Sequence, residues 1–529
     1  MPYLVQHLIS ESARQRPDKE ALRYKNTSLS YAELDAQASA LAAGLLDLGL
    51  ARGERVAVYA EKRVEAVVGL FAAVTAGCVF VPINPLLKSE QVAYILGDCN
   101  VRVLITTRER LPLLAEALGH CPDLRHVIVA GEPPTPGGVP DIALVSWDEA
   151  IANSSGRQAH RTIDSDMAAI LYTSGSTGKP KGVVLSHGNI VAGAQSVAQY
   201  LELSEHERIL AVLPLSFDYG LNQITTGFLT GSCAVLMNYL FPRDIVGLVT
   251  KERITGLAAV PPLWIQLAHL EWPESVHEHL RYITSSGGAM PTATLAQLRR
   301  SLPRTKPYMM YGLTEAFRST YLPPEEVDRR PESMGRAIPN AEILVLREDG
   351  TPCAPNEPGE LVHRGVLVSL GYWNDAQKTA ERFKPLPGQD KALPIRELAV
   401  WSGDTVRQDE EGYFYFMSRR DEMIKTSGYR VSPTEIEEVL YATRLVGEAA
   451  ALGVAHPVLG QAIAVIATPA EGVTLTPDRV KTECQKHLPA FMVPAHVEIL
   501  AGSLPRNPNG KIDRKQLALE RQHLFEGAQ

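Results

Sequence analysis

Short runs of β-branched and apolar residues alternate with longer apolar-periodic stretches over the first 340 or so positions of the chain. Residues 55–60 (RVAVYA), 78–83 (CVFVPI) and 101–107 (VRVLITT) have the length and composition of buried strands. Between the first two lies an apolar run, residues 66–77, which ends in glycine and predicts a buried helix. Strands that alternate with helices in this way predict layered α/β structure with parallel sheets.

One helix also has a recognisable start. In the segment LSYAELDAQASALAAGLLDLGL, Ser30 stands where a helix would begin and Glu33 follows three residues later. This is the spacing of a capping box, in which each side chain accepts from the backbone of the other residue. The segment therefore predicts a helix that begins directly after Ser30.

The pattern changes beyond about residue 340. Segments such as AEILVLREDG, GELVHRG and EGYFYFMSRRD predict strands joined by turns, and together they indicate a β-rich subdomain. A helix should then begin near Ser432, with Pro433 in its first turn and Glu435 at the capping-box position. The remaining strands and helices predict a small α+β domain, for which we place the boundary near Asp421.

Composition narrows the possible functions. The chain has 529 residues, 45% hydrophobic and 21% charged, with a net charge of −8. This length can bury a large core, and the acidic balance argues against nucleic-acid binding, which needs a concentrated basic face. Six cysteines without metal-ligand spacing predict reduced thiols and a cytoplasmic location. The N-terminal segment does not resemble a signal peptide, and the longest apolar run is too short to span a membrane.

The segment LYTSGSTGKPKGVVLSHGN is the most suggestive of binding chemistry. It is not a Walker A loop, because Gly175 and Gly178 stand too close together and Pro180 occupies the position of the magnesium-binding hydroxyl. Hydroxyl donors, glycines and lysines nevertheless suit a phosphate group. Composition alone leaves two interpretations open, a phosphate-binding loop or a flexible connector.

The rest of the chain changes that balance. The loop YTSGSTGKPKGV is similar to the signature loop of the adenylate-forming superfamily, which comprises acyl-CoA synthetases, adenylation domains of peptide synthetases and luciferases. Further motifs follow in the order typical of that superfamily: SSGGAMP, MMYGLTEA, GELVHRG, SGD, SRRDEMIKTSGYRVSPTEIE and LPRNPNGKIDR. The resemblance implies an α/β fold with a large AMP-binding domain of layered subdomains (residues 1–420) and a small mobile domain with the catalytic lysine (residues 421–529).

The resemblance also implies ATP and Mg²⁺ as cofactors and assigns residues to them. Thr314 would contact the α-phosphate, Glu315 would hold the metal, and Lys511 would bridge the reacting carboxylate and the α-phosphate. The other residues implied to bind the nucleotide are Thr173, Ser174, Gly175, Ser176, Thr177, Gly178 and Lys179 for the phosphates, Gly287, Gly288, Ala289, Tyr311 and Gly312 for adenine, and Asp404 and Arg419 for the ribose.

By the same resemblance, the small domain would rotate about Asp421 between two half-reactions. In the second orientation a loop with Lys425, Gly428 and Tyr429 would take the place of Lys511, and Gly428 would leave room for a pantetheine arm. An acyl acceptor that uses such an arm is CoA or a carrier protein.

The segment PLSFDYGLNQ bears on the acid that is activated. Phe217 and Asp218 resemble the FD pair of amino-acid-activating domains, whose aspartate binds the substrate ammonium, and Asn222 lies one helical turn further on. A carboxylate in an apolar pocket favours a cationic partner. Alternatively, Asp218 caps a helix.

Three functions remain open at this point. The first is an AMP-forming acid–thiol ligase of the acyl-CoA synthetase type, and the second is an amino-acid:carrier-protein ligase in which Asp218 binds the ammonium. The third is a luciferase-type oxygenase, which nothing in the sequence favours. The expected partners are a small carboxylic or amino acid and possibly a carrier protein, with no nucleic acid and no membrane span.

Overall fold

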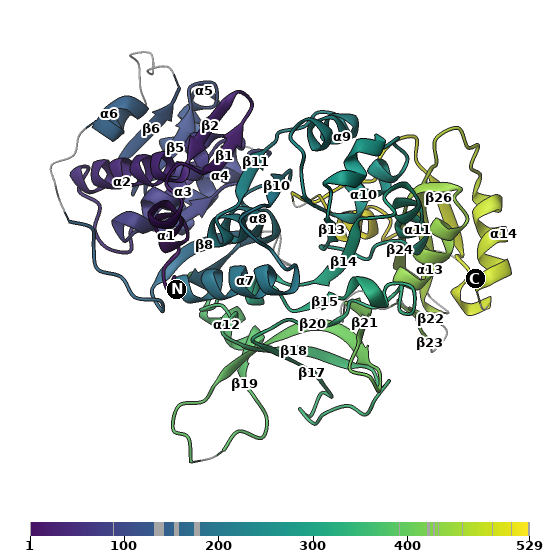
Figure 1. Ribbon diagram of the computed structural model, residues 1–529. Coiled ribbons are helices and arrows are strands. Elements are labelled where there is room, and N and C mark those ends of the chain that lie inside the picture. Colours follow the sequence, from purple (N-terminus) through teal and green to yellow (C-terminus); the bar gives the residue numbers. More distant parts are fainter. Residues whose placement is uncertain are drawn as a thin grey trace.

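The computed structural model describes most of the chain (Figure 1). The described residues are 2–87, 89–131, 142–152, 158–173, 180–390, 392–419, 424–426, 429–431, 433–456, 459–488, 490–508 and 510–526. Four β-sheets with helices packed between and around them confirm the predicted α/β class.

The first sheet has seven strands in the order β7-β6-β5-β3-β4-β8-β9, all parallel except for β9 at the edge. Its strands are β3 Arg55–Tyr59, β4 Val79–Pro82, β5 Val101–Thr107, β6 His126–Ala130, β7 Ala143–Ser146, β8 Met167–Thr173 and β9 Lys181–Ser186. The three strands predicted from the apolar runs are therefore confirmed. The helices that precede, link or follow these strands are α1 His7–Gln15, α2 Tyr31–Asp47, α3 Val64–Ala76, α4 Ser89–Asp98, α5 Leu111–Leu118, α6 Trp147–Ala152 and α7 His187–Tyr200.

Two of these helices begin or end as the sequence predicts. Ser30 and Glu33 form the reciprocal capping box of α2. Helix α3 is almost entirely buried and ends at Gly77, which adopts a left-handed conformation (φ 81°) that favours glycine.

The second sheet has nine strands in the order β16-β15-β14-β13-β12-β10-β11-β1-β2. Its centre is parallel, whereas the pairs β1–β2, β14–β15 and β15–β16 at the two edges are antiparallel. The strands are β1 Glu20–Tyr24, β2 Thr27–Ser30, β10 Arg208–Ala211, β11 Cys233–Leu236, β12 Gly256–Ala259, β13 Tyr282–Ser285, β14 Lys306–Tyr311, β15 Thr320–Leu322 and β16 Arg336–Ala337. The helices in this part are α8 Asp218–Thr230, α9 Pro242–Lys251, α10 Pro261–Ala268 and α11 Thr292–Ser301, with short 3₁₀ helices η1 Glu274–Glu278, η2 Thr314–Ala316 and η3 Pro324–Glu326.

One large hydrophobic core joins the two sheets. It includes apolar side chains of α2, α3, α7 and α8 together with strands of both sheets. Because α7 and α8 also pack on each other, the ends of the two sheets are held in a fixed relation.

The β-rich subdomain predicted after residue 340 is confirmed as a third sheet, in the lower part of Figure 1. Strands β17, β18, β20 and β19 lie in that order, and β21 pairs with β20. The elements are β17 Ala341–Leu346, β18 Gly359–Gly365, α12 Ala376–Arg382, β19 Phe383–Pro385, β20 Leu398–Gln408 and β21 Phe414–Arg419.

The fourth sheet belongs to the C-terminal part, drawn in yellow and yellow-green at the right of Figure 1. It consists of β22 Ile424–Thr426, β23 Tyr429–Val431, β24 Val446–His456, β25 Gly460–Pro469 and β26 His496–Ile499, with α13 Pro433–Ala442, α14 Pro477–His487, η4 Ala490–Met492 and α15 Arg514–Glu520. The chain changes sheet between Arg419 and Ile424, which supports the proposed boundary at Asp421 although Asp421 itself lies outside the described residues. Helix α13 begins at Pro433, as expected, whereas the predicted cap Ser432 is not described.

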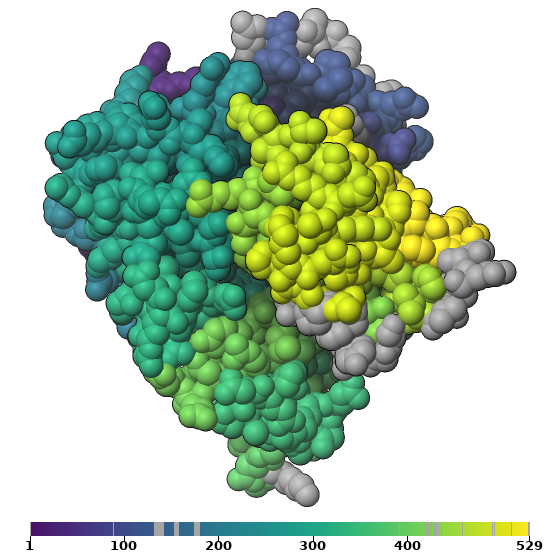
Figure 2. Space-filling model, turned by 90° about the vertical axis from the view of Figure 1, so that its right-hand side faces the viewer, coloured from purple at the N-terminus to yellow at the C-terminus, as the bar shows by residue number. Residues whose placement is uncertain are grey.

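Figure 2 shows the C-terminal part packed over one side of the larger part. Asn84 of the larger part donates a hydrogen bond of 2.7 Å to the carbonyl of Pro508, close to Lys511 in sequence. Within the described part of the chain, no helix combines the length and the apolar character that crossing a membrane requires.

Candidate active site

The predicted site residues come from loops at the carboxyl ends of parallel strands. Phe217 and Asp218 follow β10, Gly287 and Gly288 follow β13, and the YGLTE segment begins at the end of β14. In open parallel sheets, ligands bind outside these ends because the loops from neighbouring strands meet there. The topology therefore brings together motifs that lie up to a hundred residues apart.

The loop that raised the phosphate hypothesis joins two antiparallel strands. Thr173 ends β8 and pairs with Lys181, the first residue of β9, so the two residues stand opposite each other at the base of the loop. A Walker A loop instead joins a strand to a helix, and the structure thus confirms that this loop is of another kind. The predicted phosphate contacts Ser174 to Lys179 lie outside the described residues.

Tyr311 and Asp404, both predicted to contact the nucleoside, lie side by side. The hydroxyl of Tyr311 donates a hydrogen bond to the buried carboxylate of Asp404. Ser402 shapes the turn before this aspartate: its hydroxyl accepts from the Asp404 backbone amide (3.1 Å) and donates to the Leu361 carbonyl (2.7 Å). Arg419 forms the last position of β21, opposite Asp404 in the register, but its side chain lies outside the description.

Thr314 and Glu315 occupy the short helix η2, which begins three residues after Tyr311. The Glu315 carboxylate accepts a hydrogen bond of 2.6 Å from the hydroxyl of Tyr372. Lys181 lies over the same tyrosine ring, with its Nζ 4.6 Å from the ring centroid. Burial lowers the pKa of Lys181, and the nearby Glu315 carboxylate opposes that shift.

Arg382 completes this group of charges. Although burial opposes the shift, Glu315 and Tyr372 raise the pKa of Arg382, and Asp404 acts in the same direction. We call this group the nucleotide side; its members are Lys181, Tyr311, Thr314, Glu315, Tyr372, Arg382 and Asp404.

Lys511 reaches the large domain at the adenine-loop glycines. A Cβ placed on Gly287 would lie 3.8 Å from Lys511 Cε and 3.8 Å from Phe217 Cζ. Gly287 also has a positive φ of 88°, so a larger residue would be strained there as well as crowded. Gly288 and Ala289, the next two residues, are exposed. The structure thus places the predicted catalytic lysine beside two predicted binding segments.

A tight loop presents this lysine. The Asn507 amide donates to the Lys511 carbonyl (2.9 Å), and the Asn507 side chain accepts from the Lys511 amide (3.1 Å). Arg506 donates to the Gly510 carbonyl (2.6 Å) and pairs with Glu448 on β24. The loop is therefore anchored both to its own sheet and, through Pro508, to Asn84 of the large domain.

Asp218 begins α8 and has a partner that the sequence did not suggest. It is 4% exposed, and its Oδ2 accepts a hydrogen bond of 3.1 Å from Nη1 of Arg318, which is 1% exposed. Burial raises the pKa of Asp218, while the Arg318 guanidinium and the Lys511 ammonium favour its charged form. The alternative that Asp218 caps the helix is wrong, because the cap position is Phe217 and no side-chain cap is formed.

Asn222 lies one turn along the same helix and is 1% exposed. Its Nδ2 has no hydrogen-bond partner among the described residues. We call Phe217, Asp218, Asn222 and Arg318 the acyl side of the site.

The structure does not describe the side chains that were predicted to act in the second half-reaction. Asp421 and Gly428 are not among the described residues. Lys425 and Tyr429 lie on β22 and β23, but their side chains are not described. Their roles stay predictions.

Four residues of the site escaped the sequence analysis as individual candidates: Lys181, Arg318, Tyr372 and Arg382. Lys181 lies inside the quoted loop YTSGSTGKPKGV, and Tyr372 follows the motif GELVHRG by seven residues, so attention to each position of these segments would have included them. Arg318 is the second residue after TEA, yet an arginine gives no sign in a sequence that it is buried. Arg382 comes from α12, far from any motif.

The nucleotide side fits the implied nucleotide and metal. Two cations, Lys181 and Arg382, suit phosphate oxygens, and Asp404 suits ribose hydroxyls. Mg²⁺ takes few protein carboxylates and completes its octahedron with water and phosphate oxygens, so Glu315 is a sufficient protein ligand.

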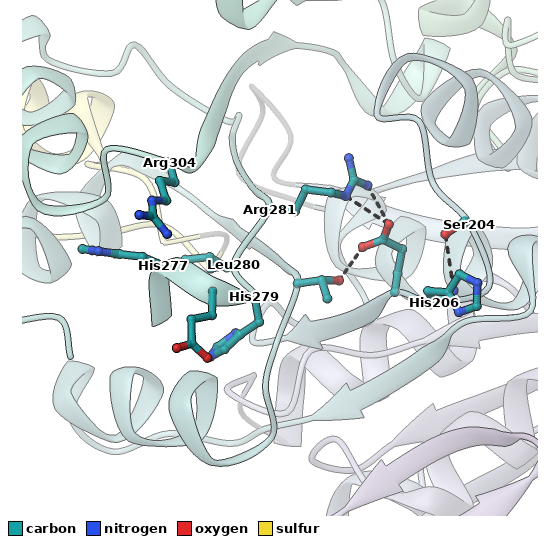
Figure 3. Close-up of a pocket in the computed structure, with 10 residues that line it drawn as sticks. Ser204, His206, His277, His279, Leu280, Arg281 and Arg304 are labelled. Atoms are coloured by element: carbon teal, nitrogen blue, oxygen red, sulfur yellow. Dashed lines mark hydrogen bonds and ion pairs between the residues drawn. The ribbon is translucent and has the colours of Figure 1, made fainter. Parts of the chain in front are cut away.

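A separate pocket of about 390 Å³ lies at the opposite ends of the strands (Figure 3). Its residues Glu207, Thr255 and Arg281 directly precede β10, β12 and β13. Arg281 donates two hydrogen bonds to Glu207 (2.8 and 3.1 Å), and Thr255 donates a third. Its central carboxylate is thus satisfied within the pocket, which is distinct from the candidate active site.

Comparison with known proteins agrees with this geometry. The family model for AMP-binding enzymes matches residues 9–373, and the model for their C-terminal domain matches residues 435–511. The chain is 30% identical to indoleacetate–CoA ligase of Aromatoleum aromaticum, with 95% of each chain covered. It is 32% identical to L-proline–[L-prolyl-carrier protein] ligase of Streptomyces coelicolor, covering 93% of this chain and 92% of that protein.

Other relatives differ in length or are known as structures. The chain is 30% identical to a linear gramicidin synthase of Brevibacillus parabrevis over 97% of its own length, but it spans only 10% of that protein. The solved anthranilate–CoA ligase in complex with anthranoyl-AMP superposes with a TM-score of 0.87 at 25% identity, covering 99% of this chain and 98% of that one. A similar solved structure, of an o-succinylbenzoate–CoA synthetase of Bacillus subtilis, holds ATP and a magnesium ion. The predicted enzyme class, an AMP-forming acid–thiol ligase with ATP and Mg²⁺, is thus confirmed, and the chain belongs to the AMP-binding enzyme family.

Proposed function

We propose that Lys511 and Thr314 hold the reacting groups while a substrate carboxylate attacks the α-phosphorus of ATP. The new bond joins a carboxylate oxygen to phosphorus, and the bond to pyrophosphate breaks. Lys511 supplies positive charge where negative charge develops, which is the arrangement that lowers such a barrier most effectively. The supporting observation is that Lys511 Cε and Phe217 Cζ converge on the same point at Gly287.

The nucleotide side would hold ATP. Lys181 and Arg382 would attract the phosphate oxygens, Glu315 would hold Mg²⁺, and Asp404 would accept from the ribose hydroxyls. Bound Mg²⁺ neutralises phosphate charge and orients the leaving pyrophosphate. These assignments are supported by the grouping of the residues around Tyr372 and Tyr311.

The second half-reaction requires the small domain to turn. A thiolate would attack the acyl carbon of the adenylate, and AMP would leave with the bonding electron pair. The docked Lys511 loop represents the adenylate-forming orientation, and the change of sheet between Arg419 and Ile424 supports a hinge at Asp421. Residues 425–429 would then approach the site.

The acceptor and the acid define two candidate functions. The first is transfer to CoA, as the name of indoleacetate–CoA ligase suggests. The second is an amino-acid:carrier-protein ligase, which is favoured by the burial of Asp218 near Lys511 and by similarity to the prolyl-carrier ligase. The six cysteines of the chain are free thiols, which supports our further proposal of a cytoplasmic location.

ATP–pyrophosphate exchange across a panel of carboxylic and amino acids tests the first half-reaction. Transfer of the activated acid to CoA or to a carrier thiol then identifies the acceptor. If no acid supports exchange in the presence of Mg²⁺, the proposal is wrong. Oxygen consumption by the adenylate without any thiol would instead identify a luciferase-type oxygenase.

A further inference from the structure

The acyl side contains a buried ion pair whose cation comes from the chain itself. Asp218 and Arg318 are a hundred residues apart in sequence, and their side chains are 5% and 2% exposed. The guanidinium also lies over the ring of Tyr219, with its carbon 4.7 Å from the ring centroid. A buried carboxylate with a guanidinium at hydrogen-bond distance has its charge neutralised before any substrate enters.

The backbone is bent tightly to bring Arg318 to this position. Phe317 has φ 56° and ψ −55°, and the amide of Arg318 donates to the carbonyl of Ala316 at 2.6 Å, which together form a γ-turn. This turn is strained for a residue other than glycine, and such strain persists only where the surroundings enforce it. The ring of Phe317 is fixed against α7 at Gly193, where an added Cβ would lie only 2.4 Å from Phe317 Cδ1.

These contacts do not use all the hydrogen-bond donors of Arg318. Its Nη1 donates to Asp218 and to the Phe317 carbonyl (2.9 Å), but Nε and Nη2 have no partner among the described residues. The buried Nδ2 of Asn222, one helical turn from Asp218, also has none. Buried donors without acceptors cost free energy, so a ligand that supplies acceptors at this place is stabilised.

The charged groups around Asp218 limit the charge that such a ligand can carry. The charged groups that act on this carboxylate are Arg318 and Lys511. If Lys511 neutralises the reacting carboxylate of the substrate and Arg318 neutralises Asp218, every charge is paired. A substrate ammonium would then add an unpaired positive charge, and a second substrate carboxylate would add an unpaired negative one; both are costly in a buried site.

From this balance and the unmet donors, we infer that the acid activated here has an uncharged acyl part with a hydrogen-bond acceptor, such as a hydroxyl or carbonyl oxygen, which Arg318 and Asn222 bind. This inference rests on the proposed function and specifies its substrate class. Asp218 then acts as the positioning residue of Arg318 and not as the site of an ammonium group.

The test is ATP–pyrophosphate exchange with matched acids that differ in one substituent. One series is butanoate, 3-hydroxybutanoate, 3-aminobutanoate and methylsuccinate, and a larger one is 3-phenylpropanoate, phenyllactate, phenylalanine and benzylmalonate. We expect the hydroxyl member of at least one series to exceed the other three by about tenfold or more in kcat/KM, because a site built for a polar group rejects analogues that leave its donors unpaired.

Variants distinguish recognition from a merely structural role. Arg318→Met removes the internal cation, so Asp218 should now accept a hydrogen bond from a substrate ammonium. The kcat/KM for the amino acid of each series should then rise relative to that for the hydroxyl acid. In the double variant Arg318→Met/Asp218→Asn, this rise in activity with the amino acid should disappear. Arg318→Lys keeps the positive charge but lacks the planar set of guanidinium donors. It should therefore lower kcat/KM for the hydroxyl acid more than for the other acids. Arg347→Met, at an exposed arginine paired with Glu357, is the control.

Several results would overturn the inference. A wild-type preference for amino members that Asp218→Asn abolishes would establish ammonium recognition, with the proposed function intact. Equal exchange with hydrocarbon and hydroxyl members would show that the donors do not recognise the substrate. Exchange with no acid at all would refute the proposed function as well. If Arg318→Met does not fold, the wild-type series and Arg318→Lys still decide.

Discussion

Glu315 on the nucleotide side and Asp218 on the acyl side are both carboxylates placed by sequence motifs, but their surroundings differ. Glu315 accepts from the neutral hydroxyl of Tyr372, and it interacts electrostatically with Lys181 and Arg382. Asp218 is directly paired with the guanidinium of Arg318. A carboxylate with a neutral partner keeps its charge available to a metal, whereas one with an internal cation does not. The motif therefore locates a carboxylate, and its nearest partner determines its use.

We propose that Lys511 acts on both sides of the site, so its loss should have the largest effect. Lys511→Ala should reduce pyrophosphate exchange by about 10²–10³-fold, the range found when one transition-state donor is removed. Thioester formation from synthetic acyl-adenylate should be retained, because in the proposed mechanism the small domain presents another loop for that step. Both rates are measured on the same preparation.

The control for this variant is Lys515→Ala, an exposed lysine on α15. It should leave both half-reactions close to wild type. Equal loss of both half-reactions in Lys511→Ala would contradict the two-orientation mechanism.

Glu315→Gln should produce the next largest loss, about 10²-fold in exchange, with a higher Mg²⁺ requirement. The amide keeps the shape and can still accept from Tyr372, so only the charge is removed. Titration of activity against Mg²⁺ at fixed ATP and acid measures the shift. An unchanged Mg²⁺ dependence would show that Glu315 is not a metal ligand. The proposed difference between the carboxylates of the nucleotide side and the acyl side would then lose its support.

Gly193→Ala should act on the acyl side alone. The added methyl group would press on Phe317 and displace Arg318, which should lower the free energy of unfolding by about 1–3 kcal/mol. We expect KM for the acid to rise more than KM for ATP. Gly247→Ala on α9 is the matched control, because nothing lies within 4 Å of its added Cβ. A larger change in KM for ATP would show that Phe317 supports the nucleotide side instead.

His363 should give the smallest effect, through pH. It is fully buried beside Ser319, the neighbour of Arg318, and burial lowers its pKa to about 3. The unfolded chain binds a proton at this residue below about pH 6.5, whereas the folded chain does not. The stability from this group is thus present above pH 6.5 and is lost at about 1.4 kcal/mol per unit as pH falls toward 3.

Denaturant unfolding of the wild type and His363→Gln between pH 4.5 and 7.5 checks this effect, within roughly the range where histidine titrates. The difference between the two proteins should depend on pH with the slope of one proton. A difference that is constant with pH would mean that the folded and unfolded chains bind the same number of protons at His363, so that burial does not lower its pKa.

The sequence by itself determined the α/β class, the capping of α2, the β-rich third sheet and the positions of the nucleotide motifs. These features depend on local patterns: apolar periodicity sets an element, and a contiguous loop such as YGLTE keeps its residues together. Only the tertiary structure decided that Arg382 joins Glu315 and Asp404, and that Arg318 pairs with Asp218. Those pairings depend on which strand ends meet and on the turn at Phe317, and no local pattern of residues encodes how two distant segments face each other.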